Sequence, residues 1–173
     1  PISHYGVTKL DSENLLLDSG RAITFRLATA FGMSERMRLD LLVNEFVYKA
    51  LTDRYITLFQ ANAIRNYIHI KDVSSAFEFM IDNYEDNVGE AFNVGLSDTN
   101  LNKRELTGRI KKYIPDFVVN ESDYYEDPDK RNYIVSNKKI ERLGWRPGHS
   151  LDDGIAELIK GYGILRPNTF TNA

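Results

Sequence analysis

Apolar residues follow two spacings along the first third of the chain, one helical and one typical of strands. Leucines recur among acidic and polar residues up to Leu17, which predicts an amphipathic helix that ends at Gly20. Residues 21–32 form a β-branched and apolar run, the pattern of a buried strand that enters a loop. Residues 39–51 return to helical spacing and residues 55–60 alternate as a strand, so the order of elements indicates an α/β fold.

The same alternation continues through the middle of the chain. Residues 65–70 have the composition of a strand, and Asp72 is expected to cap the following helix, at residues 73–83, by accepting a backbone N–H. Residues 89–95 then form a short strand between two glycines. Strands and helices therefore keep alternating, as they do in α/β proteins.

Capping patterns mark the helices of the last third. Asn102 opens a capping box, which predicts a helix that begins there. The polar and acidic residues 120–132 are expected to form a surface loop. Ser136 is expected to cap a helix that Gly144 ends, and Ser150 opens a second capping box. The C-terminal part of the chain is thus more helical than the rest.

Tyr5 and Lys9 carry the candidate chemistry. They are four residues apart, so a helix places their side chains one above the other on one face. A phenol titrates at about pH 10 in water, and a fixed ammonium beside it favours the phenolate. Such a phenol can serve as a general acid or base. Tyr67 and Lys71 have the same spacing within a strand-like run, so the spacing alone does not establish a catalytic pair.

Composition and charge restrict the classes of function. With 173 residues, of which 42% are hydrophobic and 27% charged, the chain resembles one globular domain. A net charge of -3 does not favour nucleic acid as a partner, and no apolar run is long enough to cross a membrane. The absence of cysteine makes the cytosol, and thus a cytoplasmic protein, the default expectation. The three histidines lack ligand spacing, so no metal site is expected.

The opening stretch "PISHYGVTKLDSE" resembles the active-site helix of the extended short-chain dehydrogenases/reductases, specifically the nucleotide-sugar epimerases and dehydratases. Later stretches resemble further signatures of that family in the same order, namely "FRLATAFG", "RNYIHIKDVSSAF", "EAFNVG" and "KIERLGWRPGHSLDDGI". The resemblance thus covers nearly the whole chain. The residues of the opening stretch that match the family pattern are Pro1, Ser3, Tyr5, Gly6, Thr8, Lys9 and Glu13.

This resemblance implies an α/β fold composed of a partial Rossmann-type unit and a small α/β substrate-binding domain. Residues 1–35 are expected to be the C-terminal remnant of the NAD(P)-binding Rossmann domain. Residues 36–173 are expected to form the substrate-binding part, with some segments returning to the Rossmann sheet. The implied cofactor is NAD or NADP, and the implied ligand is a nucleotide diphosphate-sugar.

The resemblance also implies roles for individual residues. Tyr5 would be the general base, and Lys9 its electrostatic partner, with both contacting the cofactor. Arg65 and Arg131 would bind the diphosphate, for which a guanidinium is well suited. Arg65 has the alternative role of an ordinary surface residue on a strand. Two further substrate positions, Thr29 and Asp40, depart from the asparagine that relatives often have.

The 173 residues contain no G-x-x-G-x-x-G turn, which in this family receives the cofactor pyrophosphate. The chain is therefore expected to match the C-terminal half of such an enzyme and to be inactive alone. An incomplete sheet would expose the edge of the strand at residues 21–32, which favours a homo-oligomer or association with another chain. The alternative is a stand-alone nucleotide-sugar-binding or protein-interaction module without catalysis.

Overall fold

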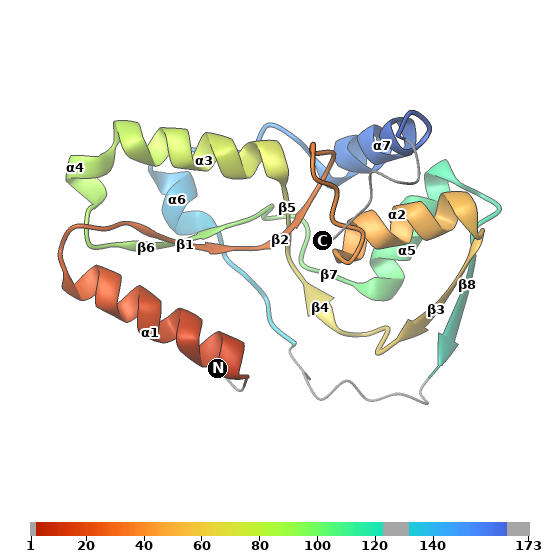
Figure 1. The fold of residues 1–173 in the computed structure, drawn as a ribbon, viewed down its shortest axis with the longest axis horizontal. Coiled ribbons are helices and arrows are strands. Elements are labelled where there is room, and N and C mark those ends of the chain that lie inside the picture. Colours follow the sequence, from red (N-terminus) through yellow and green to blue (C-terminus); the bar gives the residue numbers. More distant parts are fainter. Residues whose placement is uncertain (1–2, 123–131, 166–173) are drawn as a thin grey trace.

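The computed structural model describes residues 3–122 and 132–165 and has a mixed α/β fold, as the sequence predicts (Figure 1). Its strands form four pairs, of which three are parallel and one is antiparallel. The elements in chain order are α1 (His4–Asp18), β1 (Thr24–Leu27), β2 (Thr29–Phe31), α2 (Leu42–Thr52), β3 (Tyr55–Phe59), β4 (Ile64–Arg65), β5 (Tyr67–His69), α3 (Ile70–Asp82), α4 (Tyr84–Asn87), β6 (Ala91–Val94), β7 (Leu101–Asn102), α5 (Lys103–Tyr113), β8 (Val118–Ser122), α6 (Lys138–Arg142) and α7 (Leu151–Tyr162).

One end of the molecule is organised around β1 and β6. These two strands run parallel, with Thr24 opposite Ala91 and Leu27 opposite Val94. Helices α1 and α3 lie on opposite faces of the pair, and Figure 1 shows the pair between them. Helix α6 packs against β6. This is the layered arrangement that parallel strands require, because both of their faces need cover.

The other end of the molecule holds most of the core. Strand β2 pairs with β5, β3 pairs with β8, and β4 pairs with β7 in the antiparallel sense. Helix α2 packs against β3, α5 and α7. Phe31, Tyr67 and Phe117 are among the largest fully buried side chains. The chain between β1 and β2 connects the two ends at Ala28.

Several sequence predictions of boundaries are confirmed. The capping boxes at Asn102 and Ser150 are both present, and each begins a helix as expected. Gly20 and Gly144 follow α1 and α6 with positive φ, which ends those helices without the strain that another residue would suffer. Local side-chain chemistry fixes these boundaries, so the sequence alone could reveal them.

Two predicted caps are wrong. Helix α3 begins at Ile70, with His69 as the N-cap whose side chain accepts from the Lys71 N–H. Asp72 lies within the first turn instead, and its buried carboxylate accepts from Gly148 and His149. The N-cap of α6 is Asn137, not Ser136.

Two predicted segments are also different in the structure. Residues 21–32 contain two short strands that separate at Ala28, because β1 pairs with β6 whereas β2 pairs with β5. In the first of these strands only Thr24 is buried, and none of the strands within residues 3–122 and 132–165 pairs with its second edge. The predicted loop at residues 120–132 begins as part of β8, and residues 123–131 lie outside the described part of the chain.

Candidate functional site

The structure brings Tyr5 and Lys9 together on the first turns of α1. Ser3 is the N-cap of this helix, and its hydroxyl accepts a hydrogen bond from the Gly6 N–H at 3.1 Å. Lys9 Nζ lies 5.7 Å from the centroid of the Tyr5 ring, so the ammonium and the phenol ring are neighbours on one helix face. Tyr5 is 67% exposed, which leaves its phenol open to a ligand.

The second tyrosine and lysine with this spacing are not a pair. Tyr67 belongs to β5 and is fully buried, whereas Lys71 is in the first turn of α3. Lys71 donates to Glu157, on α7, at 2.5 Å. Of the two identical spacings, the structure places both members on one helix face only for Tyr5 and Lys9.

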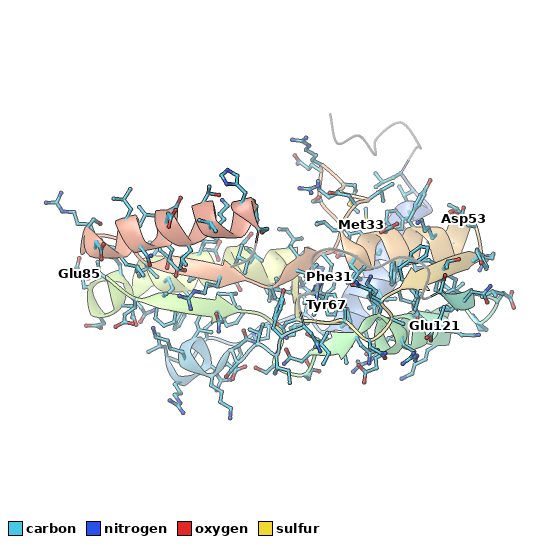
Figure 2. All side chains as sticks on the ribbon, turned by 90° about the horizontal axis from the view of Figure 1, so that it is seen from below. Phe31, Met33, Asp53, Tyr67, Glu85 and Glu121 are labelled. Carbon is cyan, nitrogen blue, oxygen red and sulfur yellow. The ribbon has the colours of Figure 1, made fainter. Side chains whose placement is uncertain are left out.

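A groove of about 650 Å³ separates α1 from β1, and Tyr5 and Lys9 line it. Leu10 and Leu16 of α1 line it as well, together with residues 23–27 from and beside β1. Figure 2 shows α1 lying beyond β1 on the side away from β6, so the groove opens at the edge of the sheet. The candidate catalytic pair therefore faces an open channel with a largely apolar wall.

A salt bridge between Glu13 and Arg26 fixes α1 to this sheet. Arg26 Nη2 lies 2.6 Å from Glu13 Oε1, and Arg26 Nε donates to Oε2 at 3.0 Å. The hydrogen bond from Arg26 is the main reason that the pKa of Glu13 is lowered. Glu13 stands on the same face as Tyr5 and Lys9, at steps of four residues. The ion pair thus holds the face that carries both of them toward β1.

A second group of candidate residues lies around β4. The Arg65 guanidinium carbon is 5.4 Å from the centroid of the Tyr133 ring, and Nη1 donates to the Ile64 carbonyl at 2.8 Å. Asn132 accepts from the Ile64 N–H at 3.1 Å, which holds the incoming segment beside β4. The stacked ring orients a planar group that is suited to phosphate oxygens.

The remaining predicted substrate residues are less closely gathered. Thr29 is half-buried in β2, and its N–H donates to the carbonyl of Asn66, the neighbour of Arg65. Asp40 is exposed in the loop before α2 and accepts from Arg38 at 2.7 Å. Arg131 lies outside the described residues, although the segment that follows it reaches Arg65. The structure thus brings Thr29 near Arg65 along the strand and holds Asp40 in a local ion pair.

Sequence reasoning missed Tyr133 and the cluster around Glu157. Glu157 lies 2.7 Å from His69 Nε2 and accepts from Lys71 and the Met33 N–H. Burial raises the pKa of Glu157, but the hydrogen bonds from Lys71 and His69 outweigh it and lower that pKa to about 2. These partners are 86 or more residues apart in sequence, so no local pattern could reveal them. This cluster attaches α7 to β5 and has a structural role.

Residues 3–122 and 132–165 contain no group of three or more His, Asp or Glu side chains arranged to hold a metal ion. In the same ranges no helix is long and apolar enough to span a bilayer.

Comparison with known proteins shows which family and which structures this chain is similar to. Residues 1–95 match the model of the "NAD dependent epimerase/dehydratase family". The dTDP-4-dehydro-6-deoxyglucose reductase of Escherichia coli is 29% identical over 173 residues, which cover 92% of this chain and 52% of the reductase. A UDP-glucose 4,6-dehydratase-containing trifunctional protein of Arabidopsis thaliana is 23% identical, with 25% of its length covered. The chain thus spans between a quarter and about half of the length of these curated relatives.

Solved structures share the fold. The UDP-glucose 4-epimerase of Thermus thermophilus in complex with NAD superposes with a TM-score of 0.79 at 20% identity, covering 94% of this chain and 55% of the epimerase. The Pseudomonas aeruginosa protein named RMD, complexed with NADPH, gives a TM-score of 0.75 at 17% identity, covering 94% and 57%. The expected fold class is therefore confirmed.

Proposed function

Because the chain belongs to the NAD dependent epimerase/dehydratase family, we propose that it carries the catalytic tyrosine and the substrate-binding part of an enzyme that acts on nucleotide sugars by hydride transfer. The observation that carries this proposal is the Tyr5–Lys9 pair, which lines the groove beside β1. Residues 1–35 would belong to the cofactor-binding unit, and residues 36–173 would hold most of the substrate site.

Tyr5 acts in this proposal as the general base that removes a proton from a sugar hydroxyl. Its phenol is exposed, and the Lys9 ammonium, one helical turn away, stabilises the negative charge that develops on the phenol oxygen. The ion pair between Glu13 and Arg26 keeps both side chains facing the groove. The helix, its cap and its anchor thus form one unit that positions the proton-transfer group.

The described residues fit one part of a nicotinamide cofactor. The phenol of Tyr5 and the ammonium of Lys9 would hold the ribose and nicotinamide end. A bound nicotinamide cofactor would supply the hydride-transfer chemistry. The pyrophosphate has no matching cradle in the 173 residues, since no glycine-rich turn is present. The isolated chain is accordingly proposed to be inactive.

Arg65 is proposed to bind the diphosphate of the nucleotide sugar. Its guanidinium lies over the Tyr133 ring, and Asn132 accepts from the N–H of the neighbouring Ile64. Arg131, which lies outside the described residues, is proposed as a second ligand of the same diphosphate, because two guanidinium groups would match its charge. Thr29 and Asp40 would lie along the path of the sugar and nucleotide. The alternative is a stand-alone nucleotide-sugar-binding or protein-interaction module without catalysis, in which Tyr5 has no role in proton transfer.

The substitution Tyr5→Phe in the full-length enzyme that carries this chain tests the catalytic role. We expect kcat to fall by about 10²- to 10⁴-fold, the usual contribution of a general acid or base, with nucleotide-sugar affinity unchanged. Tyr113→Phe, on the exposed face of α5, is the matched control. Full turnover by Tyr5→Phe would remove Tyr5 from the mechanism and favour the binding module.

A further inference from the structure

Asn44 carries a buried amide in the first turn of α2. The residue is only 3% exposed, and a buried amide lowers stability unless both of its ends form hydrogen bonds. Asn44 Oδ1 accepts from the Gly32 N–H and Asn44 Nδ2 donates to the Arg38 carbonyl, each at 3.1 Å. One end must accept and the other must donate, so neither aspartate nor leucine, which are similar in size, could make both bonds.

These two bonds close the β2–α2 loop, residues 32–41, which contains neither helix nor strand. Gly32 begins the loop with a φ of +113°, and a Cβ there would lie 2.6 Å from His69 Nε2, so the turn requires glycine. Within the loop Met37 is 1% exposed, and its sulfur accepts from the Ser34 N–H at 3.3 Å. The loop therefore has a defined shape, and Asn44 holds it at two points.

Helix α7 also holds Asn44 and the β2–α2 loop. The Tyr162 hydroxyl donates to the Asn44 carbonyl at 3.0 Å. Burial raises the pKa of Tyr162, so its phenol keeps the proton that it donates. Glu157 accepts from the Met33 N–H at 3.3 Å, so side chains of two helices bind consecutive backbone amides after β2. The position of Asn44 is thus itself fixed by its packing against α7.

A continuous series of contacts runs from β2 to Asp40 through Asn44. Thr29 lies in β2, the strand that leads into Gly32. Beyond the Asn44 amide, Arg38 donates from Nε to Asp40 Oδ1 at 2.7 Å and from Nη2 to Oδ2 at 2.5 Å. A guanidinium that binds both oxygens of a carboxylate fixes its orientation as well as its position. Asn44 therefore links Thr29 and Asp40, which the proposed function assigns to the substrate.

We propose that Asn44 is a positioning residue that sets the placement of Asp40 relative to Thr29 in the substrate site. This role rests on the proposed function and adds the residue that arranges two of its contacts. Asn44 is buried, so it acts through the Gly32 N–H and the Arg38 carbonyl and not on the ligand itself. A hydroxyl and a carboxylate at a fixed separation suit the hydroxyl groups of a sugar or ribose. Loss of the Asn44 amide should therefore weaken nucleotide-sugar binding and leave the proton-transfer step unaffected.

Calorimetric titration of the 173-residue chain with UDP-glucose and with dTDP-glucose tests this role. We expect Asn44→Ala to weaken the binding of the nucleotide sugar by at least about tenfold, because Thr29 and Asp40 no longer present a fixed pair of contacts. Asn87→Ala is the matched control, since Asn87 is 8% exposed and its amide donates to the Asn83 carbonyl at 2.8 Å on α4. This variant also loses a buried amide bond to the backbone, so its Tm should fall as well, whereas its affinity should match that of the wild type.

Arg38→Ala interrupts the same series of contacts at an exposed position, so it provides a test even if Asn44→Ala does not fold. It should weaken binding too. The double variant should bind about as weakly as the weaker single variant, because both substitutions act through Asp40. In the full-length enzyme, Asn44→Ala should raise KM for the nucleotide sugar by about tenfold and leave kcat within about twofold of the wild type.

Four results would overturn this role for Asn44: wild-type affinity in Asn44→Ala, wild-type affinity in Arg38→Ala, an equal loss of affinity in Asn87→Ala, or multiplied losses in the double variant. Heat that Arg65→Ala abolishes and Asn44→Ala preserves would remove only this role and leave the proposed function in place. No heat from the wild-type chain with either nucleotide sugar would contradict the proposed function and this role together.

Discussion

Two glycines in helices should respond in opposite directions to the same substitution. Gly154 lies in α7 against the core, and a Cβ built there would be 2.2 Å from Phe31 Cε2 and 3.0 Å from His69 Cδ2. Gly108 lies in α5, and a Cβ there meets nothing within 4 Å. Alanine stabilises the interior of a helix by about 0.5–1 kcal/mol relative to glycine. At Gly108 that gain should appear undiminished.

At Gly154 the cost of overpacking the core outweighs the gain in helix stability from alanine. Phe31 and His69 are fully buried, so neither ring can move away without disturbing the core. Forcing a methyl group into such a site costs about 1–3 kcal/mol. We therefore expect Gly154→Ala to lower the free energy of unfolding by about 1–2 kcal/mol. The two variants should differ by about 2 kcal/mol, or roughly 4–8 °C in Tm for a chain of this size.

Urea denaturation followed by circular dichroism would measure both variants against the wild type. Equal slopes of the free energy against urea concentration would show that the unfolded states are comparable. A Gly154→Ala variant as stable as Gly108→Ala would refute the reasoning, since it would mean that α7 is not packed closely on Phe31.

Two further predictions concern the contacts that attach the C-terminal segment. Asp72→Ala should destabilise the fold by about 2–4 kcal/mol, because it leaves the N–H groups of Gly148 and His149 without their buried acceptor, whereas Asp82→Ala on the exposed end of α3 should be neutral in a thermal melt. Glu157 has a pKa lowered to about 2 in the folded state, so its stabilising contribution is complete above its ordinary pKa near 4.5 and is lost as the pH falls toward 2. Glu157→Gln should therefore reduce the difference between the free energies of unfolding at pH 7 and pH 3, measured by urea denaturation. An unchanged difference would contradict the lowered pKa of Glu157.

The sequence revealed most elements of the fold because their signals are local. Asn102 and Ser150 mark helix starts through hydrogen bonds that close within three residues. The strand β3 also lies where alternating apolar residues predicted it. Asp72 failed as a predicted cap because its carboxylate is used by residues 76 and 77 positions away, which no local pattern encodes.

In the candidate site, too, local contacts could be predicted from the sequence and contacts between distant segments could not. Tyr5 and Lys9 could be predicted because a single helix brings them together. The contact of Arg65 with Tyr133 depends on a distant segment that folds back beside β4, so it could not be predicted from spacing. The burial of β1 was overestimated for a related reason, since an apolar strand sequence says nothing about whether its neighbour is present.

The most direct test of the proposed function is a calorimetric titration of the 173-residue chain with UDP-glucose, with dTDP-glucose and separately with NAD. We predict saturable heat with at least one nucleotide sugar and none with NAD. Arg65→Ala should abolish that heat, whereas Arg142→Ala, an exposed arginine on α6, should leave it intact. One-to-one binding of NAD, or nucleotide-sugar binding that is unaffected by Arg65→Ala, would contradict the assignment of this chain to the substrate side of the enzyme.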